Sequence, residues 1–121
     1  MKNILIIEDD SFLQGLEVSK LEKSGYAIRT ASTGNEAIKK INEPNIDLIL
    51  LDLTLPDFDG FQILTKIRAT DNVKNVYVIV FSNLSEEKYE KQAKELGAND
   101  FMIKSNFTLD ELVERIDKVL K

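Results

Sequence analysis

One segment of the chain is apolar almost throughout: Ile46-Asp-Leu-Ile-Leu-Leu-Asp-Leu53. A run of this kind predicts a strand that is buried on both faces. Asp52 stands at its end, where a buried carboxylate without a partner is costly. A second apolar run, Ile4-Leu-Ile-Ile7, ends in the same way at Glu8-Asp9-Asp10. If the two strands are neighbours in a parallel sheet, their acidic ends meet at one edge of that sheet.

The composition limits what the chain can do. Its 121 residues, 43% of them hydrophobic, fit one domain spanning 1–121. A net charge of −5 argues against general nucleic-acid binding, which needs a basic face. With no cysteine and no histidine, thiolate and imidazole chemistry are excluded. The first apolar run has only four residues, too short for a signal peptide or a membrane span, so we expect a soluble cytoplasmic protein with no membrane contact.

Strand-like and helix-like segments alternate along the chain. Strands are expected at residues 4–7, 27–31, 46–53, 76–81 and 100–103, and helices at 11–23, 33–41, 61–68, 85–97 and 108–120. On the first helix, the apolar residues expected on one inward face are Phe12, Leu13, Leu16 and Leu21. Short connections and strands buried on both faces predict an α/β fold, in which a doubly wound, five-stranded parallel sheet has the flavodoxin-like order 2-1-3-4-5 and five helices cover it.

Residues suited to phosphoryl chemistry fall at the ends of four predicted strands. In open α/β sheets, ligands bind beyond the carboxyl ends of the strands. Those ends carry Glu8 and Asp9, Asp52, Ser82, and Lys104. Carboxylates suit Mg²⁺, an aspartate can attack phosphorus to form an acyl phosphate, and a lysine and a hydroxyl can bind the phosphoryl oxygens. Asp10 is expected to be a charge at a helix start.

Four motifs carry a resemblance to a known family. They are Ile4-Leu-Ile-Ile-Glu8-Asp9-Asp10, Asp52-Leu-Thr-Leu-Pro56-Asp-Phe-Asp-Gly60, Val78-Ile-Val-Phe-Ser82 and Gly97-Ala-Asn-Asp100-Phe101-Met-Ile-Lys104. Together they resemble the receiver domain of bacterial response regulators in two-component signalling, similar to chemotaxis regulators. The resemblance covers essentially the whole chain.

The resemblance implies a role for each site residue. Asp52 is the phosphoacceptor, and Lys104 pairs with the phosphoryl group. Asp9, Asp52 and the backbone carbonyl of Thr54 bind Mg²⁺, and Glu8 assists through a metal-bound water. Ser82 moves to contact the phosphoryl group, and Phe101 is the aromatic switch that responds to it.

The resemblance also implies partners. The phosphoryl group comes from a histidine kinase or a phosphotransfer protein, and the output face of the fourth helix, fifth strand and fifth helix contacts a downstream protein or an effector domain absent from this chain. The resemblance also leaves room for a phosphorylation-linked dimer that forms through the same face. No turnover enzyme is expected, only self-phosphorylation and slow hydrolysis of the acyl phosphate. The chain is expected to be either a stand-alone regulator or a domain cut from a longer protein.

Ser105 and Asn83 are among the positions that depart from the family pattern, and two other functions remain open. Ser105 replaces the usual proline after the lysine, so a cis bond there would cost about 3 kcal/mol, and Asn83 replaces a small residue beside the site. One alternative is a receiver-like interaction module that works without phosphorylation. The other is a phosphatase with an aspartyl nucleophile, although such enzymes carry that residue on the first strand.

Overall fold

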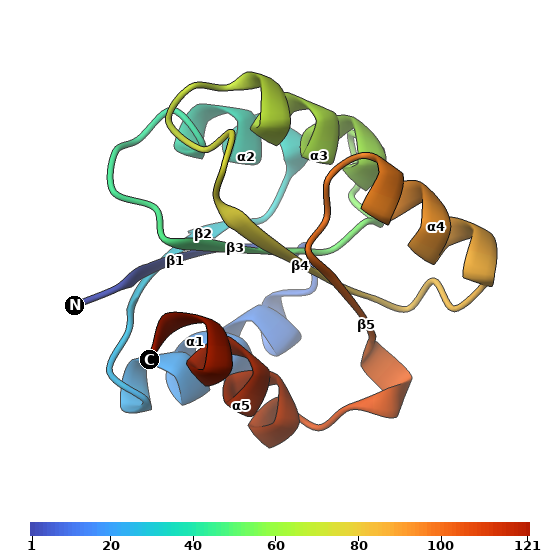
Figure 1. The fold of residues 1–121 in the computed structure, drawn as a ribbon. Coiled ribbons are helices and arrows are strands. Elements are labelled where there is room, and N and C mark those ends of the chain that lie inside the picture. Colours follow the sequence, from blue (N-terminus) through green and yellow to red (C-terminus); the bar gives the residue numbers. More distant parts are fainter.

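The computed structural model describes all residues from 1 to 121 and contains one five-stranded parallel sheet. Its strands are β1 (Asn3–Ile7), β2 (Ala27–Ala31), β3 (Leu48–Leu51), β4 (Tyr77–Ser82) and β5 (Asp100–Ile103). The helices are α1 (Ser11–Lys23), α2 (Gly34–Lys40), α3 (Gly60–Ala69), α4 (Glu87–Glu95) and α5 (Leu109–Leu120), with a 3-10 turn at Lys104–Asn106. The strand order is β2-β1-β3-β4-β5, which confirms the predicted order. Helices α2, α3 and α4 cover one face of the sheet, and α1 and α5 cover the other (Figure 1).

Strand register brings the two acidic segments together. Ile7 of β1 is paired with Leu51 of β3, so the residues that follow them leave the sheet side by side. The Asp52 amide donates a hydrogen bond to the Ile7 carbonyl at 2.9 Å, and the Glu8 amide donates to Ala31 at 3.0 Å. The backbone is therefore fixed at the point where the carboxylates project.

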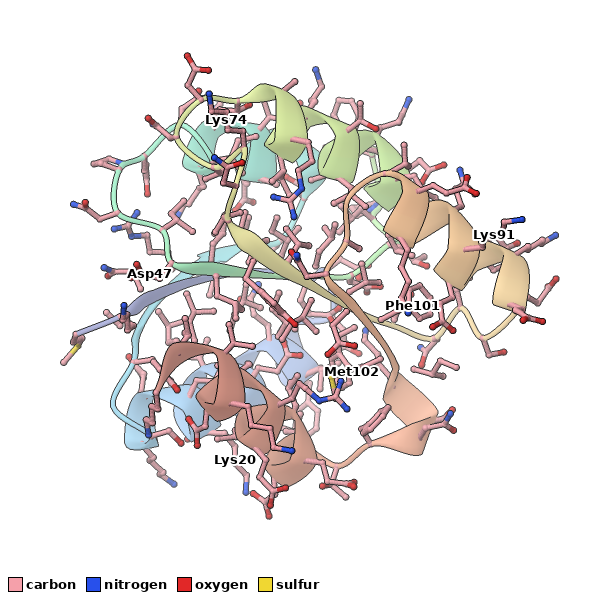
Figure 2. All side chains as sticks on the ribbon, viewed as in Figure 1. Lys20, Asp47, Lys74, Lys91, Phe101 and Met102 are labelled. Carbon is pink, nitrogen blue, oxygen red and sulfur yellow. The ribbon has the colours of Figure 1, made fainter.

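Alternation along the strands divides the core into two apolar layers. On β5, Phe101 packs partly buried against the layer beneath α2, α3 and α4, whereas Met102 is fully buried in the layer toward α1 and α5. Figure 2 shows these two side chains on opposite sides of the strand. None of the helices combines the length and the hydrophobicity that a membrane-spanning segment needs.

Helix ends follow the local sequence in most places. Asp10 caps α1 by accepting hydrogen bonds from the amides of Phe12 and Leu13, which confirms its predicted place at the helix start. Threonine and glutamate three residues apart predict a capping box, and Thr108 and Glu111 form this box at the start of α5. From its residue type, Ser85 is expected to cap the helix predicted at 85–97, and this prediction is wrong. The cap position of α4 is Glu86, which makes no side-chain capping bond, and Ser85 lies before it in the loop from β4.

The predicted inward face of α1 is also wrong in part. Phe12 is 76% exposed and Leu16 is 42% exposed, whereas Glu17 is only 1% exposed and lies one turn before the buried Leu21. Apolar residues occur on more than one side of this helix, so periodicity alone does not define its buried face. The rotation of α1 is instead set by packing against β2 and α5.

Candidate functional site

Three carboxylates converge at the carboxyl ends of β1 and β3. One oxygen from each of Glu8, Asp9 and Asp52 lies within 4.8 Å of the others. Glu8 and Asp52 are 2% and 5% exposed, and Asp9 is exposed to solvent. These residues belong to a pocket of about 320 Å³, which we call the acidic pocket. Its lining consists of Glu8, Asp9, Asp10, Asp52, Thr54, Asn83 and Lys104.

Lys104 reaches this pocket from the end of β5. Strand β4 separates β5 from β3, and the long lysine side chain spans that distance. Its Nζ lies 2.7 Å from Glu8 Oε1 and 3.1 Å from Asp52 Oδ2, with only 12% of the side chain exposed. One buried ammonium group therefore bridges the two buried carboxylates.

Burial and charge both change the proton affinity of these groups. The pKa of Glu8 is raised to about 7, mainly by burial and in part by the charge of Asp52, although the hydrogen bond from Lys104 opposes the shift. Burial would lower the pKa of Lys104, but its hydrogen bond to Glu8 and the charge of Asp52 outweigh this, so its pKa is raised. Lys104 is consequently a permanent cation at neutral pH, and Glu8 is poised to gain or lose a proton.

Backbone amides hold the carboxylates in place. Glu8 Oε2 accepts a hydrogen bond from the Asp10 amide at 3.1 Å, and Asp52 Oδ1 accepts one from the Thr54 amide at 3.2 Å. Gln14 Nε2 donates to the Glu8 carbonyl at 2.9 Å and to Ser32 Oγ at 3.2 Å, which ties together the loops that follow β1 and β2.

The side chain of Asp57 holds the loop after Asp52 against the start of α2. The carboxylate of Asp57 accepts hydrogen bonds from the amides of Gly34 at 2.7 Å and Asn35 at 3.0 Å, at the start of α2. Amide donors lower the pKa of Asp57 although its own desolvation raises it. Neither Gln14 nor Asp57 can be identified from the sequence, because their side chains join separate segments of the chain and no local motif marks them.

The donor set fits a magnesium ion. Mg²⁺ takes oxygen ligands at about 2.1 Å in octahedral geometry, so two of its ligand atoms lie about 3 to 4 Å apart. The three carboxylate oxygens already lie within 4.8 Å of one another, close to that spacing. The ion also suits the charge, since Glu8, Asp9 and Asp52 offer three negative groups and Lys104 one positive group.

Other residues singled out in the sequence lie around this pocket or behind it. Thr54 and Asn83 line it, and Thr54 also forms an isolated antiparallel bridge with Asp59. Ser82 is fully buried, is not among the lining residues, and accepts a hydrogen bond from the Leu84 amide at 3.3 Å. The Lys104–Ser105 segment contains no cis bond and forms a 3-10 turn. The peptide bond between Lys104 and Ser105 is therefore trans, at the position where family members usually have proline after the lysine.

Comparison with known families assigns the chain. The model of the response regulator receiver domain matches residues 4–117. The chain belongs to this family of two-component response regulators, whose members generally act as phosphoacceptors.

The relatives show the same family. The alkaline phosphatase synthesis transcriptional regulatory protein PhoP of Bacillus subtilis is 36% identical over 121 residues, which cover 99% of this chain and 49% of PhoP. The transcriptional regulatory protein ResD of the same organism is 36% identical over 118 residues, which cover 98% of this chain and 48% of ResD. The chain thus spans about half the length of these curated relatives.

Solved structures agree with this assignment. A two-component response regulator from Clostridium difficile has a TM-score of 0.91 and 31% identity, covering 99% of this chain and 96% of the other. The receiver domain of the sensor histidine kinase PA1611 from Pseudomonas aeruginosa has a TM-score of 0.86 and 26% identity, covering 98% and 96%. That structure has a magnesium ion coordinated in its active-site cleft.

Proposed function

We propose that residues 1–121 act as one receiver unit in which Asp52 accepts a phosphoryl group with the help of Mg²⁺. The observation that carries this proposal is the acidic pocket: three carboxylate oxygens within 4.8 Å of one another, beside a buried lysine that contacts Asp52. Asp9, Asp52 and the Thr54 carbonyl would hold the ion, with Glu8 acting through a bound water. When bound, Mg²⁺ would neutralise charge between the carboxylates and the phosphoryl oxygens.

The transfer needs little from the protein beyond positioning and charge. An oxygen of the Asp52 carboxylate forms a bond to phosphorus while the bond from phosphorus to the donor breaks, and the donor leaves with that electron pair. Lys104 exchanges its contact with Asp52 for the incoming phosphoryl oxygens. Asn83 lines the same pocket and limits the room available to the donor.

The switch proposed for this chain runs from Ser82 to Phe101. Ser82 Oγ lies at the end of β4 with one weak backbone bond to release, and Phe101 is partly buried on β5 toward α4 (Figure 2). A shift of Ser82 toward the phosphoryl group would open space for the ring, and the surface of α4, β5 and α5 would change. A change of charge at Asp52 would in this way shift the protein between two arrangements of Ser82 and Phe101.

The partners follow from this chemistry. The donor would be a histidine kinase or a phosphotransfer protein, because the chain has no histidine of its own to phosphorylate. The output would be a downstream protein or an effector domain that contacts the surface of α4, β5 and α5.

The test is incubation with Mg²⁺ and acetyl phosphate, followed by intact-mass measurement. We expect a mass gain of one phosphoryl group that requires Mg²⁺ and is lost in Asp52→Asn. Asp71→Asn is the matched control, since Asp71 is an exposed loop acid away from the pocket, and it should keep the gain. No gain with any donor would favour an interaction module that works without phosphorylation. Sustained hydrolysis of a phosphate ester would favour a phosphatase.

A further inference from the structure

Glu17 is a buried acid that the proposed phosphoryl transfer does not use. It lies on α1 with 1% of its surface exposed, one turn before Leu21, which packs in the apolar layer between the sheet and helices α1 and α5. Its Oε1 oxygen is fully buried and has no hydrogen-bond partner. Acids almost never lie this deep unless they are paired, so this position needs a reason.

The charges that act on Glu17 belong to the acidic pocket. Burial is the largest cause that raises the pKa of Glu17 to about 8, and the negative charges of Glu8, Asp52 and Asp10 contribute to this rise while Lys104 opposes it. The facing helix α5 brings Asp110 near α1, but that acid is paired with Lys20 on the exposed surface. At neutral pH the Glu17 carboxyl is therefore mostly protonated, and the four charged groups that act on it all line the acidic pocket.

We propose that Glu17 couples proton release to cation binding, holding a proton while the acidic pocket lacks a divalent cation and losing it when one binds. The inference rests on the cation site of the proposed function. A divalent cation would offset the negative charge of the acidic pocket, and so would remove the repulsion that adds to burial in keeping Glu17 protonated. Glu17 forms no ion pair or hydrogen bond with the proposed ligands, so its effect is electrostatic and acts at a distance.

Coupling of this kind is reciprocal. If the cation favours the ionised form of Glu17, the ionised form must favour the cation by the same factor. Mg²⁺ should then bind more tightly as the pH rises, with a component that belongs to Glu17. Glu8 also changes protonation in this range, but its contribution remains when Glu17 is replaced.

The experiment is calorimetric titration of Mg²⁺ into the full chain, in buffers of different ionisation enthalpy, for wild type, Glu17→Gln and Glu22→Gln. Glu22 is the matched control because it lies on the exposed side of the same helix. If the pKa of Glu17 falls by about one unit, wild type and Glu22→Gln should release roughly half a proton more per cation near pH 7.5 than Glu17→Gln. Above about pH 8, Glu17→Gln should bind Mg²⁺ severalfold more weakly than wild type, and near pH 6 the two should bind alike.

A direct measurement avoids the variant altogether. The side-chain carbonyl resonance of Glu17, followed by NMR in the wild-type protein, should titrate near pH 8 without Mg²⁺ and at lower pH with it. Equal proton release in wild type and Glu17→Gln, or a titration that Mg²⁺ leaves in place, would overturn the coupling while leaving the cation site intact. Absence of any Mg²⁺ binding would overturn both proposals.

Discussion

Replacing Lys104 by methionine tests the electrostatic account of the acidic pocket. The ammonium group contacts Glu8 at 2.7 Å and Asp52 at 3.1 Å, and these carboxylates have no other basic partner. Their side chains are 3% and 6% exposed, so the variant would leave two nearly buried charges unpaired. Breaking a buried pair typically costs about 3 to 5 kcal/mol. We expect a loss of about 3 kcal/mol in the free energy of unfolding at pH 8.

The loss should depend on pH. The pKa of Glu8 is already raised from 4.5 to about 7, so the folded protein binds more protons than the unfolded chain between these values. The stabilising contribution of protonated Glu8 is complete below about pH 4.5 and is lost as the pH rises toward 7. Lys104 now lowers the pKa of Glu8, so in Lys104→Met this loss extends to higher pH. Near pH 6 Glu8 can take up a proton, and the cost of the variant should shrink to about 1 kcal/mol.

The assay is urea unfolding followed by far-ultraviolet circular dichroism at both pH values. Lys94→Met is the matched control, because Lys94 pairs with Glu90 on an exposed face of α4. Its loss should stay below about 0.5 kcal/mol. If Lys104→Met unfolds like the control at pH 8, the bridge between the two carboxylates does not stabilise the protein and the account of the pocket fails.

Three further predictions concern the pocket and its support. In the absence of Mg²⁺, Asp9→Asn should raise the free energy of unfolding by about 0.5 kcal/mol, because it removes one of three crowded negative charges. Measured by calorimetry, the same variant should bind Mg²⁺ at least tenfold more weakly than the wild type. An unchanged affinity would show that Asp9 is not a ligand. Gly60→Ala should cost about 2 kcal/mol or more in urea unfolding, because an added Cβ would collide with the backbone of Leu53, whose carbonyl oxygen would lie 2.7 Å away. Gly15→Ala, with no atom within 4 Å of the added Cβ, should instead stabilise α1 by about 0.5 to 1 kcal/mol, and equal effects of the two changes would contradict the packing. The free energy of unfolding of the wild type should fall between about pH 5 and pH 8, because Glu17 is forced to ionise, by roughly 1.4 kcal/mol per unit of its raised pKa. Glu17→Leu should flatten this fall in the same urea-unfolding assay. Parallel pH profiles of the two proteins would show that Glu17 is already ionised.

The sequence predicts the sheet well because its evidence is local and repeated. Apolar runs buried on both faces require helices on both sides, and short connections leave few possible strand orders. The acids at the ends of β1 and β3 could be brought together from that order alone. The place of Asp10 at a helix start and the capping box at Thr108 were predictable for the same reason, since the hydrogen-bond partners of both residues lie within three residues.

The features that could not be predicted from the sequence depend on contacts between distant segments of the chain. Phe12 and Leu16 belong to an apolar stripe, yet the packing of α1 turns them outward and turns Glu17 inward. The side-chain bonds of Gln14 and Asp57 join separate loops, so no spacing rule reveals them. In each case the residue type alone predicts the wrong environment for the side chain or none at all. The packing of the folded chain determines whether the side chain is buried and which groups it contacts.

The most direct test of the central claim is to locate the phosphoryl group on the chain. After incubation with acetyl phosphate and Mg²⁺, reduction by borohydride converts an aspartyl phosphate to homoserine, and peptide mass spectrometry then identifies the altered residue. We predict conversion at Asp52 and nowhere else, and loss of the phosphoryl group on treatment with hydroxylamine, as expected for an acyl phosphate. A stable phosphoryl group on a hydroxyl side chain such as Ser82, or conversion at Asp9 in place of Asp52, would contradict the account.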